Sequence, residues 1–505
     1  MGGGLIVALA AVASGCVIVR TTGRGAPSAA SIPAHPSLLA YPEKVFEPPR
    51  REDHRYTLSN GVPVYLAEDR AFPLLDVTVL IRAGSYLEPR EKVGLAGMTA
   101  TVMRTGGTAS LTAEEFDEAV DFLAAFVSCS LGDVEGRASA GCLSKDADRV
   151  LDLFFEMLRR PRFEEDRLEL ARSQSLQAMR RRNDQTGGIE AREWRRLMRG
   201  PTHFSSLQST QASIEAIDRA DLMAFHQKWV QPANFIIAVA GDFDRQAMID
   251  TLERHLADWP AGERPPAPPK PDHLPRAGLY IVNKPDVNQG RVSIGHVGGR
   301  RDNPDRHALR VMSHILGGGG FTSRILSRVR SDEGLAYSAG ADYGLGVHYE
   351  GLFRASFQSR SPACAEAIDI VLQEIERIRA EEVNPEELAT AINALAEAPA
   401  RAFADARRIV STLADDELNG ENPDYWRNYA ADLKAVTRAD VLRVARQYLA
   451  PDKLVILIVG NKEDILKGNP DRAAYSMGSL EARFGKLEDI PLPDPLTLEY
   501  PASTP

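Results

Sequence analysis

The chain has 505 residues, of which 44% are hydrophobic and 26% charged, and its formal net charge at pH 7 is -10. This composition is that of a soluble globular protein large enough for several domains. The negative charge argues against a general nucleic-acid-binding surface, so nucleic acid is not expected among the partners. Arginines crowd at residues 180–182 and 192–199, but their helical spacing favours solvated helix faces.

The first residues predict a targeting segment rather than part of the fold. The apolar run at residues 5–12 is too short to cross a bilayer. It ends in Ala13-Ser14-Gly15-Cys16, which resembles the signal of bacterial lipoproteins. The resemblance implies that residues 1–15 are a signal peptide, that Cys16 carries lipid, and that the exported chain is anchored to the periplasmic side of a membrane. Val17 favours the outer membrane. No Lys or Arg lies among the first four residues, so a cleaved secretory peptide with an incidental cysteine is the alternative.

Residues 16–50 are rich in Pro, Ser, Ala and Thr without a hydrophobic period, which predicts a flexible tether. The other cysteines, Cys129, Cys142 and Cys364, have no C-x-x-C spacing, which argues against a metal knuckle or a disulfide framework. Small buried thiols are expected. The alternative is a disulfide between Cys129 and Cys142, which flank a predicted hairpin.

An N-terminal domain is predicted over residues 51–260. It begins with a strand pair around Asn60-Gly61, a strong hairpin signal. Thr112, followed three residues later by Glu115, predicts a helix with a capping box. The other expected elements are strands at 75–81, 126–131, 137–143 and 234–240, and helices within 93–108 and at 112–124, 147–158, 164–183 and 214–230.

A Pro-rich linker is predicted at residues 261–276, followed by a C-terminal domain at 277–462 and an extension at 463–505. The elements expected after the linker are strands at 279–283, 291–296 and 349–357, and helices at 305–316, 322–332, 362–381, 385–404 and 407–418.

The two predicted domains share an internal duplication. Residues 217–222 match residues 436–441, and without a gap residues 232–241 match residues 451–460. The match lies at the same place in each half, so the sequence predicts two homologous α+β domains.

Residues 93–108 predict an amphipathic helix in a frame that opens with Gly-Leu-Ala and closes with Gly-Thr. This frame resembles the zinc helix of the insulinase/pitrilysin (inverzincin) peptidases, in which two His bind zinc and a Glu between them is the general base. Here those positions are Gly97, Ala100 and Thr101, which can neither ligate zinc well nor take a proton from water. The family's third ligand, a Glu on a later helix, falls at Gln177-Ala178. The resemblance therefore implies no metal and no cofactor in this chain.

Residues 319–338 read GGFTSRILSRVRSDEGLAYS and resemble the second-domain signature of the same family. Arg330 and Tyr337 fall on its Arg and Tyr positions, where preorganised donors stabilise the negative charge of a tetrahedral intermediate. Without the resemblance, Arg330 would be an exposed helix residue and Tyr337 a core aromatic. The four glycines at 317–320 indicate a helix stop and a close-approach loop. A loop that handles substrate, as in the family's non-catalytic subunits, is the alternative.

The resemblance implies an α+β fold of two homologous domains, each an antiparallel sheet with helices packed on one face, enclosing a chamber. It also implies a non-catalytic subunit, similar to the Arg/Tyr-bearing chain of two-subunit bacterial enzymes and of mitochondrial processing peptidase. We expect it to complete the site of a zinc-bearing homologous partner with Arg330 and Tyr337, and to bind an extended peptide at a sheet edge. The alternatives are a scaffolding or peptide-binding protein with no catalytic partner, and an active peptidase with an unrecognised metal site.

Overall fold

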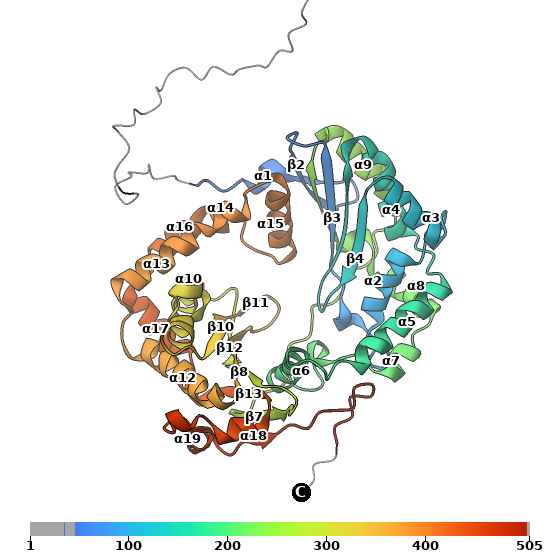
Figure 1. Ribbon diagram of the computed structural model, residues 1–505. Helices are drawn as coiled ribbons and strands as arrows, with labels where there is room; N and C mark the ends of the chain where they lie inside the picture. Colours follow the sequence, from blue (N-terminus) through green and yellow to red (C-terminus); the bar gives the residue numbers. More distant parts are fainter. Residues whose placement is uncertain (1–34, 36–45, 502–505) are drawn as a thin grey trace, which may run out of the picture. The chain divides into compact units, whose positions relative to one another are not determined.

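The computed structural model describes His35 and residues 46–501, and the described residues from Phe46 onward form one compact unit (Figure 1). The predicted signal peptide, the lipidation residue Cys16 and almost all of the predicted tether lie outside the described residues. Within the described ranges, no helix is both long enough and apolar enough to span a bilayer. Below, residues 46–260 are called the N-terminal half and residues 277–501 the C-terminal half.

The N-terminal half is built on a six-stranded sheet with the order β1-β2-β6-β3-β5-β4. The predicted hairpin at Asn60-Gly61 joins its first two strands, and Gly61 has a φ of 87°, which glycine adopts without strain. The strands are β1 (Arg55–Thr57), β2 (Pro63–Glu68), β3 (Leu74–Ile81), β4 (Phe126–Leu131), β5 (Gly136–Leu143) and β6 (Phe235–Gly241).

The C-terminal half repeats this sheet with the order β10-β12-β8-β13-β7-β14. The duplicated segments become β6 and β13, which occupy the same position in their sheets, so the predicted α+β fold of two homologous domains is confirmed. The strands are β7 (Gly278–Asn283), β8 (Gln289–Val297), β10 (Ala336–Tyr343), β12 (Leu352–Arg360), β13 (Val455–Gly460) and β14 (Glu488–Asp489), with β9 (Gly299–Arg300) and β11 (Leu345–Gly346) as a separate parallel pair.

The sheets are mixed, which corrects the prediction of antiparallel sheets. β2 runs parallel to β6, and β7 runs parallel to β13, whereas the pairs on the other side of β6 and β13 are antiparallel. A parallel pair needs a long crossover connection. In each half the chain passes through the helical layer before it reaches the central strand. The duplicated helices α8 (Arg219–Trp229) and α17 (Arg438–Tyr448) lead into β6 and β13, which then lie parallel to β2 and β7.

Helices of the N-terminal half cover one face of its sheet and bury the main core there. Thr112 and Glu115 form the predicted capping box at the start of α3. The predicted helix at 214–230 is two helices, because the carboxylate of Asp218 accepts the Asp221 backbone N–H and starts a second helix. These helices are α2 (Leu95–Thr105), α3 (Ala113–Phe122), α4 (Ala147–Arg159), α5 (Glu165–Arg180), α7 (Gln211–Glu215), α8 (Arg219–Trp229) and α9 (Arg245–Leu256).

The C-terminal half has an equivalent helical layer. The predicted helix at 385–404 is broken because Pro399 cannot continue an α-helix from the preceding turn. The helices predicted at 305–316 and 322–332 shorten to α10 and α11 and end in π-helical turns, His314–Gly318 and Ser327–Asp332. The layer contains α10 (Arg306–Ser313), α11 (Arg324–Leu326), α12 (Cys364–Ala380), α13 (Pro385–Ala396), α14 (Ala398–Ala402), α16 (Tyr425–Lys434), α17 (Arg438–Tyr448), α18 (Lys462–Lys467) and α19 (Met477–Phe484).

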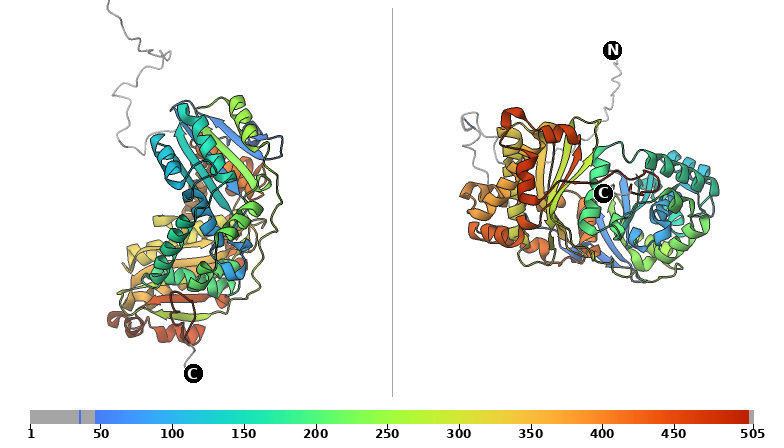
Figure 2. Two further views of the ribbon diagram at one scale, coloured as in Figure 1. Left: turned by 90° about the vertical axis from the view of Figure 1, so that its right-hand side faces the viewer. Right: turned by 90° about the horizontal axis from the view of Figure 1, so that it is seen from below.

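Each sheet is also covered on its second face by one helix from the other half, which corrects the prediction of helices on one face only. Helix α15 (Ala406–Leu418) packs on β2, β3 and β6, while α6 (Thr186–Arg199) packs on β8 and β13 (Figures 1 and 2). The apolar side chains of β6 and β13 are buried on both faces as a result. This reciprocal exchange joins the two halves through apolar contacts.

On α6 the predicted solvated face holds for Arg195 and Arg196, which are exposed, but is wrong for Arg192. Arg192 is 5% exposed, and its Nε donates to Glu193 at 2.6 Å. The Tyr500 hydroxyl donates to the same carboxylate at 2.9 Å, so the C-terminal segment covers this side of α6. The thiols of Cys129, Cys142 and Cys364 are free, and Cys129 lies opposite Ala138 in the sheet rather than opposite Cys142. The alternative of a disulfide is therefore wrong.

A buried ion pair marks the contact of α6 with the C-terminal sheet. Both carboxylate oxygens of Glu190 accept from Arg354, at 2.8 and 2.7 Å, and Ser293 Oγ donates to the same carboxylate at 2.6 Å. The Glu190 side chain is 3% exposed. A buried carboxylate left without its partner carries a large desolvation cost, so this contact ties the halves together specifically.

We expect Arg354→Ala to lower the free energy of unfolding by about 3 kcal/mol, because it leaves Glu190 charged and buried. Lys467→Ala removes the exposed pair with Glu463 and should leave the free energy unchanged. Urea denaturation of both variants checks the expectation. Equal losses in the two would contradict it.

Glu417 forms the matching polar contact of α15 with the N-terminal sheet. Arg55 donates to its two oxygens at 2.8 and 2.9 Å, and the Tyr65 hydroxyl donates to it as well. Arg51, in α1 (Arg51–His54), lies 3.2 Å away. Burial alone would raise the pKa of Glu417, but these hydrogen bonds and charges lower its pKa to about 2.

The lowered pKa predicts a pH dependence of stability. The folded-state pKa of Glu417 lies below its ordinary value of 4.5, so the contact stabilises the protein fully above that value, and this contribution is lost as the pH falls toward 2. We expect Glu417→Gln to lower the free energy of unfolding at pH 7 by about 3 kcal/mol and to flatten its pH dependence in the acid range. Parallel stability curves for the variant and the wild type, measured by denaturation across that range, would contradict this assignment.

Candidate functional site

Helix α2 keeps the packing of the predicted zinc helix without its chemistry. Its apolar side is buried, including Leu95, Met98 and Val102. Gly97 and Thr101 lie on the exposed side, while Ala100 is 1% exposed. The Thr101 hydroxyl donates to the Gly97 carbonyl oxygen at 2.9 Å, so its one O–H donor is used within the helix.

Helix α5, which carries the predicted position of the third zinc ligand, packs beside α2 but has no acidic residue at that position. Gln177 and Ala178 are both exposed on it. Across the part of the chain that the structure describes, no three His, Cys, Asp or Glu side chains gather where they could hold a metal ion. That this chain binds no zinc stays a prediction.

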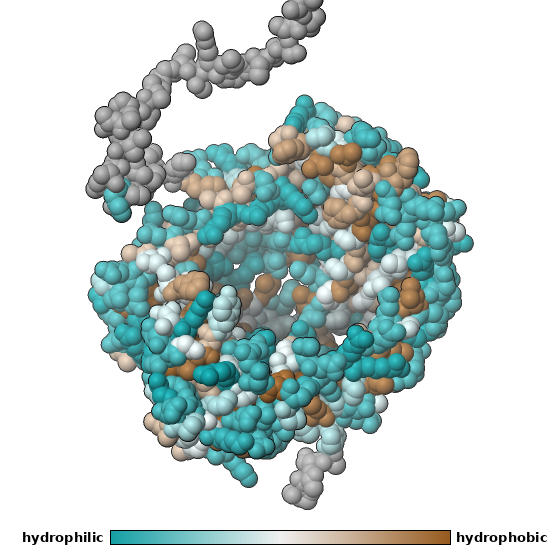
Figure 3. Space-filling model, in the orientation of Figure 1, coloured by the Kyte–Doolittle hydropathy of each residue, from teal (hydrophilic) through white to brown (hydrophobic). Residues whose placement is uncertain are grey.

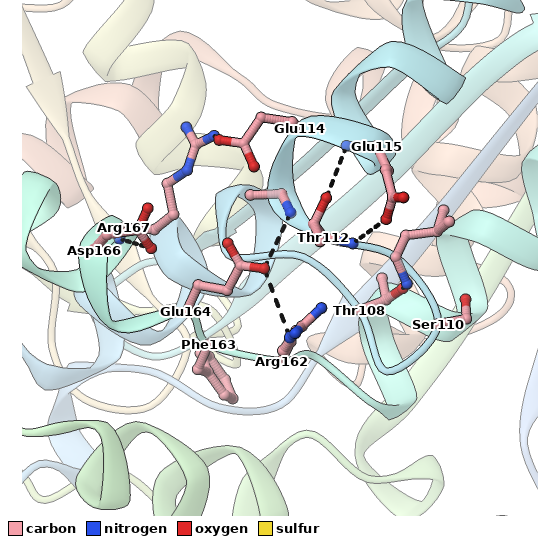
Figure 4. Close-up of polar contacts among 12 residues, drawn as sticks. Thr108, Ser110, Thr112, Glu114, Glu115, Arg162, Phe163, Glu164, Asp166 and Arg167 are labelled. Atoms are coloured by element: carbon pink, nitrogen blue, oxygen red, sulfur yellow. Dashed lines mark hydrogen bonds and ion pairs between the residues drawn. The ribbon is translucent and has the colours of Figure 1, made fainter.

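Both ends of α2 are held by specific contacts. At the start, the Glu88 carboxylate accepts from the backbone N–H groups of Gly94 and Ala96, at 3.0 and 2.6 Å. At the end, the Glu164 backbone N–H donates to the Gly106 carbonyl oxygen at 3.1 Å. The Glu164 carboxylate accepts from the Ala113 backbone N–H at the start of α3 at 3.3 Å and lies 3.6 Å from Arg162 (Figure 4). The frame is therefore stabilised by interactions that do not depend on a metal.

Gly97 within α2 and Gly94 at its N-cap should respond oppositely to substitution. A Cβ on Gly97 would meet no atom within 4 Å, whereas Gly94 has a φ of 108° and a Cβ there would lie 2.8 Å from Ile214. We expect Gly97→Ala to raise the free energy of unfolding by about 0.5–1 kcal/mol, because alanine favours the helix. Gly94→Ala should lower it. Thermal unfolding checks both, and a destabilised Gly97→Ala would reveal a constraint on the exposed side of α2.

A cavity of about 500 Å³ opens beside the first turn of α2. Gly94 and Gly97 lie on one wall, and Pro269 and Lys270 of the Pro-rich linker lie on another. His203, also in the lining, donates from Nε2 to the Pro269 carbonyl oxygen at 3.0 Å, and burial lowers the pKa of this imidazole. Sequence reasoning missed this cavity because its walls come from segments far apart in the chain.

The structure brings Arg330 and Tyr337 together and adds a third residue that the sequence did not single out. The Arg330 guanidinium lies 4.7 Å from the ring centre of Phe321 and 4.4 Å from that of Tyr337, and it donates to the Tyr337 backbone oxygen at 3.2 Å. We call these three residues the Arg330 cluster. Cation–π contacts of this kind restrict the guanidinium between the two rings.

The Arg330 cluster is open to solvent. Tyr337 is 81% exposed, which excludes the reading of it as a core aromatic. Among the residues that the structure describes, its hydroxyl has no hydrogen-bond partner, so it can donate to a bound molecule. Two π-helical turns flank the loop that carries Phe321, a feature often found at functional sites.

The glycine-rich loop is confirmed as a close-approach loop. A Cβ on Gly317 would lie 2.1 Å from the backbone nitrogen of Ala341, so only glycine fits against β10 there. This contact places the loop beside the edge strand on which Tyr337 stands.

The edge strand of the other sheet is less accessible. Arg104 of α2 donates from Nε to the Val127 carbonyl oxygen on β4 at 2.7 Å and from a terminal nitrogen to Asp117 at 2.7 Å. One backbone acceptor of β4 is thus already occupied. A peptide that added to β4 as a strand would compete with Arg104.

A second cavity, of about 670 Å³, is lined by both halves. Glu135 and Arg137 contribute from the N-terminal half, and His348 and Tyr349 from the C-terminal half. Burial raises the pKa of Glu135 and of Tyr349 and lowers that of His348. The face shown in Figure 3 is hollowed between the two halves, in agreement with the predicted chamber.

Family models match both halves of the chain. The model described as insulinase (peptidase family M16) matches residues 64–195, and the model described as peptidase M16 inactive domain matches residues 216–395. The chain belongs to this family of peptidases and peptidase-like proteins, and the prediction from residues 93–108 and 319–338 is confirmed.

Curated relatives of the chain include proteins named as peptidases and one named as a non-peptidase. An uncharacterized zinc protease of Mycobacterium leprae is 25% identical over 56% of this chain, and the non-peptidase homolog YmxG of Helicobacter pylori is 25% identical over 55%. The chain spans 64% of the length of each of these two relatives.

Solved structures share the fold. The peptidase M16 inactive domain from Pseudomonas fluorescens is 25% identical, with a TM-score of 0.72 over 80% of this chain and 97% of that one. The periplasmic protease PqqL from Escherichia coli is 15% identical, with a TM-score of 0.69 over 87% of this chain and 48% of that one.

Proposed function

We propose that this chain is the non-catalytic subunit of a zinc metallopeptidase and that the Arg330 cluster completes the site of a zinc-bearing homologous partner. The observation that carries the proposal is the geometry of that cluster. A guanidinium restricted between two rings stands beside an unpartnered phenol hydroxyl, in a chain whose α2 offers Gly97, Ala100 and Thr101 in place of metal ligands and base.

The two donors suit a developing oxyanion. Preorganised N–H and O–H groups stabilise the charge that forms on the carbonyl oxygen during peptide cleavage. Zinc held by the partner would activate the attacking water. The half-buried Arg330 and the exposed Tyr337 would bind and orient the substrate carbonyl, and Phe321 beside them would exclude water from it.

Pairing with a homologous chain is supported by length. This chain matches the fold of 48% of PqqL, so that protein is long enough to hold a second unit of this size in one chain. We infer that here the second unit is a separate zinc-bearing subunit. We also infer that the pair works on the periplasmic side of the outer membrane, to which lipid on Cys16 anchors this chain, as the sequence signal implies.

The substrate of the pair would be an extended peptide. Such a peptide adds to a sheet edge through main-chain hydrogen bonds, which demand little of its sequence. Tyr337 and Ser338 are exposed at the start of edge strand β10, whereas Arg104 occupies an acceptor on β4. We therefore place the peptide along β10, within reach of the Arg330 cluster.

The second candidate is a scaffolding or peptide-binding protein with no catalytic partner. The relative named as a non-peptidase homolog supports it, because that name separates family membership from cleavage. A stable homodimer isolated from native membranes without any zinc-bearing chain would favour this candidate.

Co-expression with the zinc-bearing homologue and a peptide-cleavage assay tests the first proposal. We expect Arg330→Ala and Tyr337→Phe each to lower kcat/KM by about 100-fold, mainly through kcat, because each removes a donor to the oxyanion. The matched controls are Arg360→Ala and Tyr56→Phe, exposed residues of the same types outside the cluster. Unchanged activity in the Arg330 and Tyr337 variants would end the pairing proposal.

A further inference from the structure

Four large apolar side chains are exposed at one end of the N-terminal sheet. Phe122 is 89% exposed and Phe72 is 70% exposed, while Leu74 and Phe126 are about half-exposed. We call these four residues the apolar end. Exposed aromatic residues gathered in this way usually mark a surface that meets another apolar phase or partner.

Strand register places Leu74 and Phe126 at the same end of the sheet, and the chain connections bring Phe72 and Phe122 to that end. Leu74 pairs with Leu143, and Phe126 pairs with Gly141, at the same end of β5. Phe72 lies in the loop between β2 and β3, which joins this end, and Phe122 closes α3 just before β4 begins. Figure 3 shows apolar surface gathered near the top of the view, over the ends of the N-terminal strands.

The described chain enters the compact unit at the same end of the sheet. His54 of α1 contacts the Leu66 carbonyl oxygen at 3.0 Å, near the end of β2. Phe46 stacks on Phe403 with ring centres 6.2 Å apart. Arg407, four residues beyond Phe403, lies 3.5 Å from Asp76, which shares the rim of the sheet with Leu74.

Charges at the apolar end compensate one another. Arg70 lies 3.7 Å from Glu68, and Arg407 is paired with Asp76. These two arginines therefore give no net positive charge with which to attract an anionic surface. The exposed rings are what this end presents to its surroundings.

We propose that the apolar end rests in the interfacial layer of a lipid bilayer, with Phe72 and Phe122 inserted among the lipids. A membrane accepts separate rings on a loop and a helix end without a matching groove, which a protein partner would need. The point of chain entry supports this occupant, because residues 16–45 would join the expected lipid on Cys16 directly to this end. Membrane contact by the apolar end would add to anchoring by lipid on Cys16. The test below uses a chain without that lipid, so it measures the apolar end alone.

The test uses the full chain with Cys16→Ser, which carries no lipid, and vesicles of equal parts phosphatidylethanolamine and phosphatidylglycerol. We expect the chain to sediment with the vesicles and to remain bound in high salt, since the contact is apolar. Adding Phe72→Ser and Phe122→Ser should weaken binding at least tenfold. Leu274→Ser is the matched control, because Leu274 is 88% exposed in the Pro-rich linker, and it should bind like its parent.

Two results would overturn the inference. The first is a parent chain that does not bind vesicles, and the second is a double variant that binds them as well as its parent. A double variant that instead loses a protein partner while vesicle binding is unchanged would assign the apolar end to that partner. Circular dichroism and the unfolding temperature check that the variants are folded. Peptide cleavage by the co-expressed pair is measured separately, so that a failure of membrane binding is distinguished from a failure of the proposed function.

Discussion

The structure depends on the burial of two sheets on both faces. Each half supplies helices for one face only, and a single helix from the other half covers the second face. Apolar strands such as β6 and β13 are stable only when both faces are shielded from water. The buried Glu190–Arg354 pair and the Glu417 contacts then fix how the borrowed helices sit, because a charge displaced from its partner there would be desolvated without compensation.

Much of the fold could be predicted from the sequence because the signals were local. The hairpin at Asn60-Gly61, the capping box at Thr112 and the duplicated helix and strand all appear as expected. The exchange of α6 and α15 could not be predicted, because helical periodicity shows that a face is apolar but not which sheet covers it. The same limit explains the error at Arg192, whose burial depends on the distant Tyr500 segment.

The candidate site divides in the same way. The resemblance of residues 319–338 to the family signature identifies Arg330 and Tyr337, and in the structure these two side chains contact each other. Phe321 was not found, because an aromatic residue next to four glycines has no pattern of its own. On α2, Gly97 and Thr101, at the two predicted His positions, lie on the exposed side, whereas Ala100, at the predicted Glu position, is buried with the packing residues. The exposed side can therefore change while the buried side keeps the helix in place.

The exchanged helices also bear on how the protein is made. A ribosome completes β2, β3 and β6 long before it reaches residues 406–418, so one face of the finished N-terminal sheet is exposed while the C-terminal half is still being synthesised. Contacts between such distant segments slow folding and prolong the exposure of apolar surface. The proposed export across a membrane would therefore favour a chain that stays unfolded until its last helices are available.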